Sequence, residues 1–128
     1  MTRNLNIVIF FTYHLPDTPP APSRPSAMEV KQDSITIKWD ESQCNGGHII
    51  QSFTIRYLET DSNPFFPFFG SFRFLRNIDP TRRNFTITDL DPETSYTISV
   101  QAISVDGRAS LYSSSAEILT LPPGKTIM

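Results

Sequence analysis

Cys44 and His48 are the residue types that bind zinc, and they lie four residues apart in a predicted loop. They could supply two metal ligands, but a structural zinc site uses four. The other histidine, His14, lies in the N-terminal leader, where it has no partner at a useful spacing. We therefore expect no metal ion here, and no catalytic group held by a base or a metal.

An acidic cluster, formed by Asp89, Asp91 and Glu93, contains the residue type that binds calcium. It lacks the ligand spacing and the glycine of a calcium-binding loop, and a solvated turn accounts for it. The chain also has no glycine-rich phosphate loop and no nucleophile elbow. These observations predict that the protein is not an enzyme, needs no cofactor and takes no small-molecule substrate.

Length and charge narrow the class of protein further. The 128 residues suit one domain, and the formal net charge is −2, with Lys and Arg scattered among Asp and Glu. Because no basic surface is apparent, we expect no nucleic-acid partner. Eleven prolines against five glycines, between runs rich in Val, Ile, Thr and Phe, indicate short strands and turns. The sole cysteine excludes an internal disulfide.

The most regular pattern lies in residues 84–102, where two alternating apolar runs flank a polar corner that contains Pro92. The second run places four apolar side chains on one face of a strand, those of Tyr96, Ile98, Val100 and Ala102. The polar residues between them fall on the other face. This period of two predicts a strand, a turn and a second strand with one buried face.

The spacing of four residues at this corner resembles the tyrosine corner of fibronectin type III domains: Leu90, Pro92, Thr94 and Tyr96. In that corner the tyrosine hydroxyl bonds to upstream backbone while its ring enters the core. Trp39, at the end of an early strand, is also similar to this family. The resemblance implies an all-β fold, a seven-stranded antiparallel immunoglobulin-like β-sandwich without a disulfide, that serves as a binding or spacer module.

Alternation predicts strands around seven segments: residues 28–30, 34–39, 53–57, 72–76, 85–87, 96–104 and 116–120. The resemblance places the first, second and fifth of these in one sheet and the other four in the second. The core is expected to centre on Trp39, Ile37, Tyr57, Ile98 and Val100, and Met28 and Val30 are also expected to face it. Phe72 and Phe74 are expected to point inward, with Arg73 outward.

The ends of the chain differ in composition from the middle. Residues 1–21 combine an apolar run, residues 7–11, with a Pro-rich linker; the run is interpreted as a secretory signal, an extra strand or a disordered leader. The domain is expected to span residues 22–121. Residues 122–128, which begin Pro-Pro-Gly, form an exit linker. Both ends therefore have the composition of junctions with neighbouring modules.

Asn84-Phe85-Thr86 is the only Asn-x-Ser/Thr sequence in the chain. Asn84 opens a predicted strand with its side chain on the face opposite Phe85, where a glycan could extend into solvent. We expect Asn84 to carry a glycan if the chain is secreted.

Four phenylalanines between the third and fourth predicted strands depart from the family pattern: Phe65, Phe66, Phe68 and Phe69. Because two prolines interrupt the run, it cannot form a regular central strand. We expect an exposed aromatic loop that contacts a partner. Two alternatives stay open: the loop covers a sheet edge, together with the apolar leader, or the stretch is foreign to the natural product.

The resemblance therefore predicts a non-catalytic protein-interaction or spacer module of an extracellular or cell-surface protein, such as a receptor or adhesion protein. The alternative is the same module in an intracellular muscle-type structural protein. The expected partners are another protein or neighbouring modules of the same chain, and contact with a membrane is made only through the parent protein.

Overall fold

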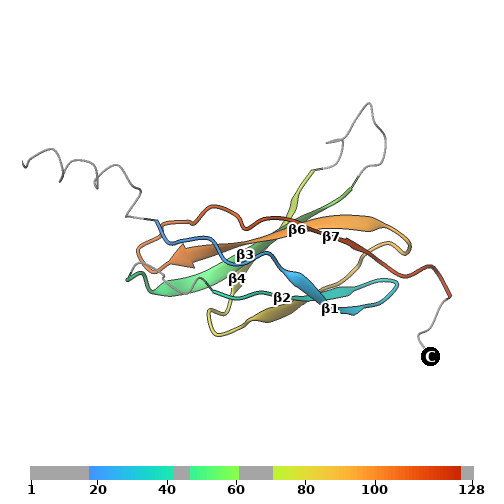
Figure 1. The fold of residues 1–128 in the computed structure, drawn as a ribbon, viewed down its shortest axis with the longest axis horizontal. Helices are drawn as coiled ribbons and strands as arrows, with labels where there is room; N and C mark the ends of the chain where they lie inside the picture. Colours follow the sequence, from blue (N-terminus) through green and yellow to red (C-terminus); the bar gives the residue numbers. More distant parts are fainter. Residues whose placement is uncertain (1–17, 42–46, 61–70, 125–128) are drawn as a thin grey trace, which may run out of the picture.

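The computed structural model describes residues 18–41, 47–60 and 71–124, which form a sandwich of seven strands (Figure 1). The strands are β1 (Ser26–Val30), β2 (Ile35–Lys38), β3 (Ile50–Glu59), β4 (Arg73–Ile78), β5 (Asn84–Ile87), β6 (Ser95–Ser104) and β7 (Ala116–Leu119). All strand pairs are antiparallel. One sheet has the order β1-β2-β5 and the other β4-β3-β6-β7. The predicted fold class and the predicted division into two sheets are confirmed.

The longest strands, β3 and β6, form the centre of the four-stranded sheet. Each has ten residues, and their register runs from Ile50 opposite Ser104 to Glu59 opposite Tyr96. Their alternation places apolar side chains toward the three-stranded sheet, where Ile35, Ile37 and Ile87 meet them. Because both strands have one face in the core, a slip of one residue would turn that face to solvent, so the core fixes the register.

The core lies between the sheets and contains all five residues on which it was expected to centre. Ile37, Ile98 and Val100 are fully buried, and Trp39 and Tyr57 are nearly so. The Trp39 ring meets the Phe53 ring edge to face, with their centroids 5.4 Å apart. Trp39 therefore lies between the two sheets and links them by aromatic contact.

Met28 does not face the core, and the expectation that it would was wrong. Ala27 pairs with Ile37 and Glu29 with Thr36, so β1 has one residue more than β2 over this interval. Met28 is this additional residue, and its side chain is 56% exposed. The bulge interrupts the alternation on which the expectation depended.

A second bulge reverses the expected orientation of the side chains on β4. Phe53 pairs with Ile78 and Ile55 with Leu75, so three steps on β4 match two on β3. Asn77, within the bulge, has a φ of 60°, a conformation that asparagine tolerates. Ile78 is therefore buried and Leu75 packs against the core. Phe72 and Phe74 are exposed to solvent, which corrects the expectation that they point inward.

The chain enters at one end of the sandwich and leaves at the other (Figure 1). At the entry, the Ser23 N–H donates to the Asp40 carbonyl at 2.9 Å, and the Asp40 N–H donates to the Ser23 hydroxyl at 2.8 Å. Pro19, Pro22 and Pro25 are buried, so the described part of the Pro-rich segment packs on the sandwich.

The exit segment is held at two points. The Leu121 N–H donates to the Lys31 carbonyl at 3.1 Å, and the Leu121 carbonyl accepts from Glu93 at 2.9 Å. The Gly124 N–H donates to the side chain of Gln32 at 3.2 Å. Hydrogen bonds to the β1–β2 turn and the β5–β6 corner therefore fix the direction of the exit.

The bulge in β1 leads to a prediction about stability. Met28→Ala should change the free energy of unfolding by less than about 0.5 kcal/mol, because the side chain is exposed. Ile37→Ala, on the neighbouring strand, should cost about 2–5 kcal/mol because it leaves a cavity. Urea unfolding of both variants measures the difference. Similar losses would contradict the orientation of Met28.

Candidate functional site

The corner between β5 and β6 has the local geometry that its residue spacing implied. The Asp91 N–H donates to the Tyr96 hydroxyl at 2.8 Å. The Tyr96 ring is buried against Tyr57, with ring centroids 6.3 Å apart and a T-shaped arrangement. Leu90 is buried beneath the corner, and its N–H donates to the Asp33 carbonyl at 3.0 Å. The corner therefore joins β6 to the β1–β2 turn.

Thr94 and Thr120 complete this corner. The Thr94 N–H donates to the Thr120 hydroxyl at 2.9 Å, while the Thr94 hydroxyl donates to the Pro92 carbonyl at 2.9 Å.

Burial raises the pKa of the Tyr96 phenol, although the hydrogen bond from Asp91 acts in the opposite direction. Tyr96 therefore stays protonated at neutral pH and keeps its O–H.

The outer face of the four-stranded sheet carries a row of arginine and aromatic side chains. The Arg56 guanidinium carbon lies 4.5 Å from the centroid of the Phe72 ring and 3.9 Å from that of Tyr112. The corresponding distance from Arg76 to Phe74 is 4.6 Å. We call these five residues the arginine–aromatic face. Each contact has the geometry of a cation–π interaction.

Hydrogen bonds on β6 position two members of this face. Arg56 Nε donates to the Ser99 hydroxyl at 3.0 Å, which orients the guanidinium plane. The Ala102 N–H donates to the Ser110 hydroxyl at 2.9 Å and the Val100 N–H to the Ser113 hydroxyl at 3.0 Å. These serines hold the segment before β7 along β6 and place Tyr112 between them, over Arg56.

Sequence reasoning missed Arg56 and Tyr112. Arg56 occupies an outward position between the inward Ile55 and Tyr57, and an arginine there is ordinary for a solvated sheet face. Tyr112 lies outside the named strands, where no alternation indicates its direction. Phe72 was placed in the predicted strand of residues 72–76 but was assigned to the wrong face; it lies directly before β4 and is exposed. The register of β3 with β4 pairs Arg56 with Phe74, and the Phe72 ring, two residues before Phe74, also meets the Arg56 guanidinium.

The other sequence candidates do not gather at one place. Asn84 is exposed at the first residue of β5, at an edge of the three-stranded sheet. Phe65, Phe66, Phe68 and Phe69 lie outside the described residues, as do Cys44 and His14. Within residues 18–41, 47–60 and 71–124, no three His, Cys, Asp or Glu side chains form a group that could hold a metal ion. Over the same residues, no helix is long and apolar enough to span a membrane.

The turn that follows β6, formed by Asp106, Gly107 and Arg108, is held by polar contacts. Asp106 accepts a hydrogen bond from the Ser104 hydroxyl, which together with Arg108 lowers the pKa of the Asp106 carboxyl. Arg108 and Asp106 also form an ion pair at 3.3 Å. Gly107 has a φ of 87°, which favours glycine at this position.

Comparison with known proteins identifies the family. The family model of the fibronectin type III domain matches residues 20–118, so the chain belongs to this family. Fibronectin type III domain-containing protein 5 from Homo sapiens is 27% identical over 93 residues, which cover 73% of this chain and 32% of the relative. The protein of the same name from Mus musculus is also 27% identical over 93 residues, which cover 73% of this chain and 35% of that relative. The chain therefore spans about a third of the length of these curated relatives.

Solved structures share the fold. A myokine structure is 26% identical, with a TM-score of 0.65, and the match covers 82% of this chain and 99% of that chain. A crystal structure of titin domains is 24% identical, with a TM-score of 0.64, and the match covers 81% of this chain and 32% of that one. The likeness to titin concerns the fold alone. Fibronectin type III domains are generally non-catalytic, and membership of this family supports a protein-interaction or spacer module.

The two buried tyrosines at the corner make a matched pair for measurement. Tyr96→Phe should lower the free energy of unfolding by about 1–3 kcal/mol, because the Asp91 N–H loses its acceptor. Tyr57→Phe should cost less than about 0.5 kcal/mol, because the described residues make no hydrogen bond to its hydroxyl. Denaturant midpoints measure both, and an unchanged midpoint for Tyr96→Phe would contradict the role of the corner.

Proposed function

We propose that this protein is a protein-binding module of an extracellular or cell-surface protein, a receptor or adhesion protein, and that the arginine–aromatic face is its contact surface. The main support is the exposure of Phe72 and Phe74, at 40% and 43%, beside two stacked arginines. Aromatic and arginine side chains are enriched at the energetic centres of interfaces. The stacking also fixes these side chains before binding, which lowers the entropy lost on association.

The cellular setting rests on different support. The relatives named fibronectin type III domain-containing protein 5 and the myokine structure favour an extracellular setting for this chain. An exposed Asn84 on an edge strand is also accessible to glycosylation. The alternative is an intracellular muscle-type module, and the state of Asn84 distinguishes the two.

The contact surface is proposed to extend to Phe65, Phe66, Phe68 and Phe69, which precede Phe72 in the chain. Replacing these four with Ser should abolish association and leave the melting temperature unchanged, because a contact surface adds nothing to the core. If the phenylalanines instead cover the sandwich, the same variant should lose stability. A large fall in melting temperature without a change in association would therefore remove these residues from the contact surface.

The face itself is tested by changing Phe72 and Phe74 to Ser together. We expect this variant to lose binding of the purified, labelled domain to the surface of cultured cells, measured by flow cytometry. Its melting temperature should stay within a few degrees of the parent value, because both side chains are exposed.

Met28→Ser is the matched control, because Met28 is also an exposed apolar residue but belongs to the other sheet. It should retain binding. Equal binding by the Phe72 and Phe74 double variant and by the parent protein would contradict the proposed contact surface.

Glycosylation of Asn84 tests the cellular setting. Expression of the chain behind a secretion signal in a eukaryotic cell should add the mass of one N-linked glycan. Thr86→Ala removes the acceptor sequence and should abolish the added mass, as shown by mass spectrometry. An unmodified Asn84 in the secreted parent protein would favour the intracellular alternative.

A further inference from the structure

The arginine–aromatic face forms one continuous row of rings and guanidinium groups across the outside of the four-stranded sheet. Arg56 contacts the rings of Tyr112 and Phe72, with its guanidinium carbon 3.9 and 4.5 Å from their centroids. The Phe72 and Phe74 centroids are 6.4 Å apart, and Arg76 lies over Phe74. Arg56 is half-buried, whereas Arg76 is exposed. Arg56 is therefore the inner cation of the row, with aromatic rings from two separate segments packed on it.

The Arg56 guanidinium has hydrogen-bond donors that the described residues do not use. Its Nε donates to the Ser99 hydroxyl at 3.0 Å. Neither Nη atom forms a hydrogen bond or an ion pair with a residue of the described chain. The unused N–H groups lie in the guanidinium plane, where they form the paired donors that suit a carboxylate.

The strands around Arg56 leave its positive charge unbalanced, although the whole chain has a formal net charge of −2. β4 and β6 contain no Asp or Glu, and the only one in β3 is Glu59, at the end of that strand opposite the inward Tyr96. Glu117, the acidic residue of β7, is separated from β3 by β6. The outer face of the described strands therefore attracts an anion at Arg56.

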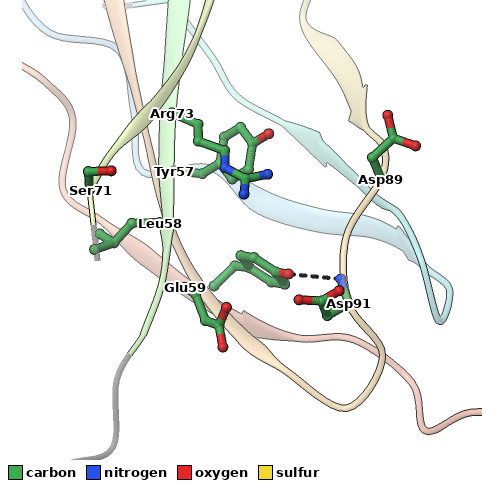
Figure 2. Close-up of a pocket in the computed structure, with 8 residues that line it drawn as sticks. Tyr57, Leu58, Glu59, Ser71, Arg73, Asp89 and Asp91 are labelled. Carbon is green, nitrogen blue, oxygen red and sulfur yellow. Dashed lines mark hydrogen bonds between the residues drawn. The ribbon is translucent and has the colours of Figure 1, made fainter. Parts of the chain in front are cut away.

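The two arginines of β4 differ from Arg56 in their surroundings. Arg76 lines a hollow of about 460 Å³ together with Asp79, whose carboxylate offsets its charge. Arg73 lies on the opposite side of β4, in a pocket of about 220 Å³ that Asp91 also lines (Figure 2). Both arginines thus share a hollow with a carboxylate, and Arg56 is the better anchor for an external anion.

We propose that Arg56 binds the carboxylate of an Asp or Glu side chain from the protein partner, and that Phe72 and Phe74 receive the apolar side chains next to it in the partner sequence. This assignment rests on the proposed function, because it places an acidic segment of the partner on the arginine–aromatic face. Phe72 and Phe74 are 40% and 43% exposed, so they offer apolar area beside the guanidinium. A charge-assisted pair surrounded by rings that exclude water has the arrangement of an interface hot spot.

A sulfated polysaccharide is a different class of acidic partner. Surfaces that bind such polymers carry a longer series of basic side chains. The arginine–aromatic face has two arginines, separated by two phenylalanine rings. The observations therefore favour a single carboxylate with apolar neighbours.

The probes for this site are acetyl-Phe-Glu-Phe-amide and acetyl-Phe-Gln-Phe-amide, which has nearly the same shape without the charge. Each is titrated into the 15N-labelled domain and followed by NMR, with the Arg56 Nε–H signal as reporter. The glutamate peptide should give saturable shifts at Arg56 and at the amides of residues 54–56 and 73–76. It should bind roughly fivefold more tightly than the glutamine peptide, the effect of one unit charge near 4 Å in water. Added salt should reduce this difference.

Two variants separate the arginines of the face. Arg56→Gln should abolish the preference for the glutamate peptide, whereas Arg76→Gln, the matched control, should retain most of it. The melting temperature of each variant shows whether the sandwich is intact. The comparison of the two peptides on the parent protein tests the site even if Arg56→Gln does not fold.

Equal binding of the two peptides by the parent protein would overturn the site, as would an unchanged preference in a folded Arg56→Gln variant. Saturable shifts with a heparin oligosaccharide, without shifts with the glutamate peptide, would also overturn it and indicate a polysaccharide partner. The contact surface is tested separately by the Phe72 and Phe74 double variant. If that variant loses cell binding while the glutamate peptide shows no preference, the carboxylate site fails and the proposed function stands.

Discussion

The pairing of β3 with β6 is the interaction on which the rest of the structure depends. These strands carry apolar side chains at alternate positions, and the three-stranded sheet can pack only on that face. The same pairing places Arg56 opposite Ser99, where the two side chains form a hydrogen bond. One register therefore determines both the core and the polar anchor of the outer face, and the two cannot be changed independently.

The sequence predicted much of the fold because its local and long-range signals agree. Alternation around Ile35, Ile55 and Ile98 indicated strands with one buried face, and the spacing that ends at Tyr96 indicated how two of them connect. Met28 and Phe72 were misassigned for a shared physical reason. A bulge adds one residue to one strand only, and the alternation of that strand does not reveal where the addition falls.

The candidate sites could be predicted less well, because they depend on contacts between segments distant in sequence. Arg56, Phe72 and Tyr112 come from three separate segments, and their contact needs the bulge in β4 and the serine contacts on β6. The pocket lined by Tyr57, Asp91 and Tyr96 likewise combines strand and corner residues (Figure 2). The acidic cluster at Asp89 and Asp91 was interpreted from the sequence as a solvated turn, and both residues are exposed in the structure.

The hydrogen bonds that hold the entry and exit segments on the sandwich have a mechanical consequence. A pull on the chain acts along the long axis of the sandwich, because the entry and the exit lie at opposite ends (Figure 1). The contacts of Leu121 with Lys31 and Glu93 bear this load before the sheets do. The hydrogen bond from Gly124 to the side chain of Gln32 also restricts rotation of the chain beyond the last strand. The fold therefore sets the directions of both ends, and the ends do not pivot freely about the sandwich while these hydrogen bonds hold.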